Sequence, residues 1–192
     1  MSNSAHLPRS TERYSPASSA SLSGSFWCMY SPTTTGAINA TMGIVGTTGD
    51  IATAIDVNST TGNVTLTGSS VPNVGSAIGG RTRTGQTNNI TMIVDGDVTL
   101  NPGTAMPLSG SRIGATGSGG NISVTAVGNI ALNSTGLGLG TSIRTTDGLT
   151  LQANAITQGP DTTIAAGSLT TSTANGANLV GTNTGMAARV LR

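Results

Sequence analysis

One short phrase recurs along most of this chain and constrains its fold more than any other feature. The phrase runs Gly, usually Asn or Asp, an aliphatic residue, then Thr, Ser or Ala, and usually a second aliphatic residue. Clear copies begin at Gly49, Gly62, Gly96, Gly120 and Gly128. A phrase that returns along a sequence indicates stacked structural repeats, because each copy builds one unit that packs on the next. The sequence therefore predicts a solenoid.

The residues inside the phrase indicate what each unit is made of. In 64–66 and 98–100, a Thr separates two aliphatic residues. Alternation with a period of two is typical of a β-strand that has one buried and one exposed face. The preceding Gly-Asn and Gly-Asp pairs suit tight turns, since these residues tolerate positive φ. Each phrase therefore predicts a turn followed by a short strand.

A longer unit groups these strands in threes. The aliphatic anchors Ile78, Ile90 and Val98 are followed by a second triplet at Ile113, Ile122 and Ile130, and a more divergent third begins at Ile143. Ile78 and Ile113 are 35 residues apart, and Ile113 and Ile143 are 30 apart. We therefore predict an all-β fold, a right-handed parallel β-helix (β-solenoid) with about three short strands per coil. Asn residues at equivalent corners are expected to stack into ladders.

Composition removes most of the chemistry of enzymes and of nucleic-acid binding. From Gly36 onward there is no aromatic residue, His, Cys, Lys or Glu, and charged residues make up only 8% of the chain, against about 25% in an average soluble domain. Between residues 36 and 188 there are four Arg and six Asp. Phosphate backbones require clustered positive charge, and single strands also require aromatic platforms. We expect no nucleic-acid partner, no cofactor, no metal site and no enzymatic activity.

Composition also divides the chain into three segments. Residues 1–35 hold every aromatic residue and the single His, Cys and Glu, and they show no sustained period. This segment is predicted to be a poorly ordered or misassigned leader, 36–185 the β-helix repeat domain, and 186–192 a tail. No stretch approaches the roughly 18 apolar residues of a membrane-spanning helix. No export signal is visible in the sequence.

The repeats resemble those of a known class of bacterial surface protein. Residues 62–67 read Gly-Asn-Val-Thr-Leu-Thr, 95–101 read Asp-Gly-Asp-Val-Thr-Leu-Asn, and 128–133 read Gly-Asn-Ile-Ala-Leu-Asn. They are similar to repeats of filamentous-haemagglutinin-like adhesins and autotransporter passenger domains. Over residues 36–185 the resemblance implies a β-helical stalk that is displayed on the cell surface for attachment. The chain is then expected to be an internal segment of a longer adhesin, or a gene fragment without a function of its own.

Parallel β-helices also host polysaccharide lyases and hydrolases, so an enzyme is the alternative. The best candidate polar cluster is Asp95 and Asp97 with Arg81 and Arg83, to which Arg112 from the next coil could add. Glycoside chemistry uses grouped acids of this kind. The competing interpretation is that the Asp residues form turns and the Arg residues are solvated. A calcium site at Asp95-Gly96-Asp97 would need a glycine-rich motif in tandem, which does not recur.

These observations favour a structural and adhesive function. The predicted molecule is a stalk segment of a large surface-exposed or secreted bacterial protein, and it is expected to be extracellular. Its expected partners are glycans or proteins on host or neighbouring cells. Because solenoids end in unpaired strand edges, self-association through these ends is a further expectation.

Overall fold

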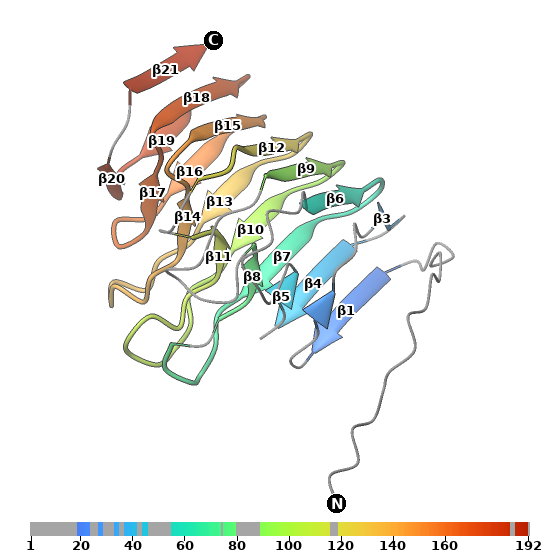
Figure 1. The fold of residues 1–192 in the computed structure, drawn as a ribbon, viewed down its shortest axis with the longest axis vertical. Coiled ribbons are helices and arrows are strands. Elements are labelled where there is room, and N and C mark those ends of the chain that lie inside the picture. Colours follow the sequence, from blue (N-terminus) through green and yellow to red (C-terminus); the bar gives the residue numbers. More distant parts are fainter. Residues whose placement is uncertain are drawn as a thin grey trace, which may run out of the picture.

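The chain forms a three-sided coil of parallel strands in the computed structural model (Figure 1). The structure describes residues 55–73, 75–79, 89–115 and 119–184 with their side chains, and the backbone of the strands at 19–23, 27–28, 33–34, 37–41, 44–45 and 187–191. Across these residues the secondary structure consists of strands and turns, with no helix.

Within the described residues, each of three parallel sheets contains seven strands. The first sheet consists of β1 (Ser19–Ser23), β4 (Ala37–Thr41), β7 (Val64–Thr67), β10 (Val98–Leu100), β13 (Ile130–Leu132), β16 (Ile156–Gln158) and β19 (Ala177–Leu179). The second consists of β2 (Trp27–Cys28), β5 (Ile44–Val45), β8 (Ala77–Ile78), β11 (Arg112–Gly114), β14 (Ser142–Arg144), β17 (Thr163–Ala165) and β20 (Thr182–Thr184). The third consists of β3 (Thr33–Thr34), β6 (Ile55–Ser59), β9 (Ile90–Val94), β12 (Ile122–Ala126), β15 (Gly148–Ala153), β18 (Ser168–Thr173) and β21 (Ala187–Leu191).

Hydrogen-bonded neighbours are always three strands apart in the sequence, so each coil contributes one strand to every sheet. The fold is a right-handed parallel β-helix with three short strands per coil, and this sequence-based prediction is confirmed. The predicted anchors Ile78, Ile90 and Val98 lie in β8, β9 and β10 of one coil. Copies of the phrase precede strands of the first and third sheets, as at Gly62 before β7 and Gly120 before β12, whereas the described strands of the second sheet follow longer or different connections.

Aliphatic side chains fill the bore of the solenoid in columns that follow the strand register. In the first sheet, Val64 pairs with Val98 and Val98 with Ile130, and all three are fully buried. In the second, Ile113 pairs with both Ile78 and Ile143. Each coil therefore buries its apolar face against the coils before and after it, as solenoid stability requires.

The three sheets extend beyond the segment that composition assigned to the repeats. Strands β1, β2 and β3 lie within residues 1–35, and β1 pairs with β4 in register. Strand β21 lies in the predicted tail and pairs with β18. The boundaries at 35 and 185 therefore do not coincide with the ends of the sheets, because parallel pairing uses backbone groups that composition does not report. Residues 1–18 lie outside the described residues.

Candidate functional site

A continuous ladder of Asn and Asp side chains runs along the corner between the third and first sheets. The backbone amide of Asp97 donates to Asn63 Oδ1 at 2.8 Å, and the amide of Asn129 donates to Asp97 Oδ1 at 2.7 Å. Farther along, Asn154 Nδ2 donates to Asn129 Oδ1 at 3.1 Å, and Asn175 Nδ2 donates to Asn154 Oδ1 at 2.6 Å. Each step joins one coil to the next, which confirms the expected Asn stacking.

Two shorter ladders occupy the other corners. Between the second and third sheets, the amide of Asn121 donates to Asn89 Oδ1 at 2.8 Å, and the amide of Gly148 donates to Asn121 Oδ1 at 3.0 Å. After the first sheet, Asn133 Nδ2 donates to Asn101 Oδ1 at 2.8 Å. The Asn of the repeated phrase thus satisfies the turn amides of the neighbouring coil, which would otherwise have only water as a partner.

The predicted polar cluster divides between this ladder and the protein surface. Asp97 is the second member of the ladder, and its Oδ1 accepts a hydrogen bond from the turn of the next coil. Asp95 is exposed in the same turn. Arg81 and Arg83 lie outside the described residues, so the convergence of the four side chains stays a prediction. Arg112 is only 3% exposed in β11, and it is therefore not available on the surface of the solenoid.

The ladder role of Asp97 predicts different outcomes for two substitutions. Asp97→Asn should be tolerated, because Asn fills the same position in the coils on both sides. Asp97→Ala removes the acceptor for the Asn129 amide and should cost about 1 kcal/mol of unfolding free energy. Urea unfolding followed by circular dichroism measures both. As the matched control, Asp95→Ala in the same turn should change stability by less than about 0.5 kcal/mol; equal losses at 95 and 97 would contradict the ladder role.

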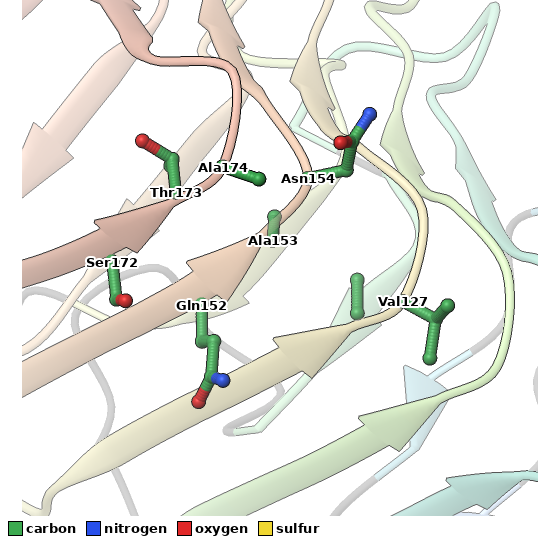
Figure 2. Close-up of a pocket in the computed structure, with 8 residues that line it drawn as sticks. Val127, Gln152, Ala153, Asn154, Ser172, Thr173 and Ala174 are labelled. Carbon is green, nitrogen blue, oxygen red and sulfur yellow. The ribbon is translucent and has the colours of Figure 1, made fainter. Parts of the chain in front are cut away.

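A shallow hollow of about 420 Å³ lies at the same corner, near the C-terminal end of the ladder (Figure 2). Its lining residues are Ala126, Val127, Gln152, Ala153, Asn154, Ser172, Thr173 and Ala174. The turn at 154–155 has two residues, whereas the flanking turns at 127–129 and 174–176 have three. A shorter turn between two longer ones leaves a dent in the corner, which accounts for the hollow.

The side chains around the hollow diverge. In Figure 2, Gln152 and Ser172 point to one side of their strands, whereas Ala153 and Thr173 point to the other, as alternation along a strand requires. No cluster of three or more His, Cys, Asp or Glu side chains occurs in the part of the chain that the structure describes. The hollow therefore gathers neither an acid–base pair nor a set of metal ligands.

The outer side of the third sheet carries two columns in which hydroxyl and amide side chains predominate and Ile93 is the apolar exception; we call it the hydroxyl face. From β9 to β18 the first column is Thr91, Ser123, Thr150 and Thr170, and the second is Ile93, Thr125, Gln152 and Ser172. Neighbours within a column are about 4.8 Å apart, the spacing of paired strands. None of the eight residues is charged, and the first column continues from Thr91 to the exposed Asp56 of β6. From β9 to β18 the face is therefore regular, neutral and rich in hydrogen-bonding groups, and sequence reasoning did not single it out.

The second sheet differs from this face because it carries two Arg residues. Arg112 is buried in β11, and Arg144 follows one coil later in β14, paired with Gly114. Burial lowers the pKa of the Arg144 guanidinium, which nevertheless stays protonated at any physiological pH because its ordinary pKa is so high. These two cations belong to the wall of the solenoid and not to the hydroxyl face.

No protein-family model, curated protein or solved structure matches this chain. Among the residues that the structure describes, no helix is long and apolar enough to cross a membrane.

Proposed function

We propose that this chain is a rigid β-helical stalk segment of a large bacterial surface protein and that it mediates attachment through the hydroxyl face. The observation that carries the proposal is the uninterrupted register of that face over four coils. The repeat phrases, which resemble those of filamentous-haemagglutinin-like adhesins and autotransporter passengers, support the same function. An extracellular location follows from the proposal.

The contacts between successive coils are those expected of a rod that resists mechanical force. Parallel pairing continues through all three sheets, and an Asn/Asp ladder joins five successive coils at one corner. With the backbone paired in every strand, a protease finds little extended chain to cleave. Such a rod can hold a binding surface away from the cell, and strand edges at its two ends offer a route to self-association.

The hydroxyl face suits neutral partners such as glycans on host or neighbouring cells, or polar protein surfaces. Its hydroxyl and amide groups both donate and accept hydrogen bonds, so they can exchange bonds with water for bonds with sugar hydroxyls. Because each bond contributes little net free energy, an extended array is needed for useful affinity. An enzymatic function lacks comparable support, since Asp97 is engaged in the corner ladder.

Binding to whole cells and to an array of neutral glycans tests the proposal. The variant Thr125→Glu/Gln152→Glu places two charges on adjacent coils of the hydroxyl face and should reduce binding at least tenfold. Its matched control is Thr65→Glu/Thr99→Glu, which places two charges on adjacent coils on the outer side of the first sheet and should bind as the wild type does. Equal binding by both variants, or no binding by the wild-type protein, would contradict attachment through this face.

A further inference from the structure

Three neighbouring loops between the first and second sheets form a second surface, distinct from the hydroxyl face. They comprise residues 68–73, 101–111 and 133–141, and we call them the loop ridge. Figure 1 shows these loops projecting together from one side of the coil stack, between β7 and β8, β10 and β11, and β13 and β14. In a three-sided coil, the corner between the first two sheets lies opposite the third sheet. The loop ridge is therefore on the opposite side from the hydroxyl face.

Hydrogen bonds between the loops hold the ridge in a defined shape. The amide of Ser69 donates to Ser109 O at 2.8 Å, and the amide of Asn73 donates to Pro107 O at 2.9 Å. The amide of Gly110 donates to Leu139 O at 2.6 Å, which joins the second loop to the third. Ser109 is fully buried, and its hydroxyl accepts from the amide of Ala105 at 3.2 Å. The loops thus continue the stacking of the coils.

The ridge exposes large apolar side chains and carries no charge. Val71 is 45% exposed, Met106 62%, Leu108 38% and Leu137 54%, so each of the three loops presents at least one. None of the three loops contains Asp, Glu, Lys or Arg. At the C-terminal margin of the ridge, Asp161 Oδ2 accepts a hydrogen bond from Ser134 Oγ at 3.1 Å. Large exposed apolar side chains on three loops that are hydrogen-bonded to one another indicate an interaction site.

The chemistry of the ridge matches a second copy of itself. Because the ridge has no charged side chain, it cannot form ion pairs with a charged partner. The hydroxyl face of another chain is too polar to pack against the exposed apolar side chains of the ridge. Half of the 26 residues in the three loops are exposed, which is fewer than the roughly 20–30 residues on each side of a standard protein interface. The contact is therefore smaller than a standard interface and should be weak and reversible. A surface that pairs with its own copy does so about a two-fold axis.

We propose that two chains associate side by side through their loop ridges, with their solenoid axes antiparallel. The two-fold axis passes through the central loop, so Met106 and Leu108 pack against the same residues of the second copy. Val71 then faces Leu137 of the second copy, and the two Asp161 carboxylates lie at opposite ends of the contact. This arrangement leaves both hydroxyl faces exposed on the outer sides of the dimer. The association does not depend on the attachment function proposed above.

Sedimentation equilibrium over a range of protein concentrations measures the association. The wild type should show a concentration-dependent monomer–dimer equilibrium. Val71→Lys alone and Leu137→Glu alone should each weaken the dimer at least tenfold, because each leaves a charge against an apolar side chain. Val71→Lys/Leu137→Glu in one chain should restore association, because the new charges face each other across the antiparallel contact. Val127→Glu is the matched control, since Val127 is 68% exposed but lies outside the ridge.

Each remaining outcome would overturn the proposal. A wild type that stays monomeric at every concentration contradicts self-association. Single variants that dimerise as the wild type does, or a Val127→Glu variant that weakens the dimer equally, would place the contact elsewhere. Failure of the double variant to restore association would exclude the antiparallel arrangement. Flotation of the monomer with neutral phosphatidylcholine vesicles, lost in Met106→Glu, would make the ridge a lipid-binding surface instead.

Discussion

The double variant Gln158→Leu/Thr171→Val is expected to be more stable than the wild-type protein by about 2–3 kcal/mol. Both residues face the bore, where Gln158 is 2% exposed and Thr171 is 1% exposed. Gln158 Oε1 and Thr171 Oγ1 are buried without a hydrogen-bond partner. A buried polar group left unsatisfied costs about 1–3 kcal/mol. Replacing these groups by apolar ones of similar shape removes that cost.

The register shows why the replacements should fit. The preceding coil has Leu132 at the position of Gln158 and Leu151 at the position of Thr171. One contact is lost, because Gln158 Nε2 donates to Thr162 O at 3.2 Å, and the gain at this position is reduced accordingly. Thr173, at the end of the same strand, also has an unpartnered buried hydroxyl. Gln158, Thr171 and Thr173 of this coil therefore form a polar layer, whereas the buried strand positions that face the bore from β9 to β15 are apolar.

Denaturant unfolding measures the increase in the free energy of unfolding, and amide hydrogen exchange shows which coils become more stable. In the wild type, the coils after the polar layer should exchange faster than those from β9 to β15, because a solenoid opens where its nearest-neighbour contacts are weakest. The double variant should reduce that difference. Thr170→Val, in the same strand but on the outer side, serves as control and should change stability by less than about 0.5 kcal/mol. Equal stabilisation by Thr170→Val would show that the effect is β-propensity and not bore chemistry.

The polar layer also shows where sequence reasoning ends. The phrase at 98–100 alternates cleanly, so its strand and its buried face could be predicted from sequence. Residues 168–173 read Ser-Leu-Thr-Thr-Ser-Thr, and Leu169 is the one apolar residue that marks the inward face. Alternation from Leu169 places Thr171 and Thr173 on the same face, and the pairing of Thr171 with Leu151 of β15 agrees with this. The sequence could not show that the hydroxyls of Thr171 and Thr173 are buried without hydrogen-bond partners.

The candidate surfaces were predictable to different degrees. The ladder follows from the phrase itself, since Asp97 occupies the place that Asn63 and Asn129 occupy in neighbouring coils. The hydroxyl face required the register, because its members come from strands about 20–32 residues apart. The loop ridge lies in the inserted residues that make coil lengths unequal, where the phrase is absent. The periodicity of the sequence therefore predicts the strands and the ladder, but it does not predict the loop ridge, which is absent from the repeated phrase.

Leu100→Ala is expected to lower the free energy of unfolding by about 3–4 kcal/mol. This loss should be larger than that caused by truncating a Leu at the end of the same column. Leu100 is fully buried, and in register it lies between Leu66 and Leu132. Removing a buried Leu side chain costs about 2–5 kcal/mol through lost transfer free energy and the cavity that remains. A cavity here weakens the contacts on both sides, because each coil packs on two others.

Leu179→Ala provides the matched comparison, because Leu179 belongs to the same column at the last strand of the first sheet. It is only partly buried and packs beside Gln158, so its loss should cost about 1 kcal/mol. Urea unfolding should also become broader or biphasic in Leu100→Ala, because a weakened central coil uncouples the coils before it from those after it. Leu179→Ala should keep the wild-type transition shape. Equal costs at the two positions would mean that the solenoid unfolds as one indivisible unit, and not coil by coil from its weakest contact.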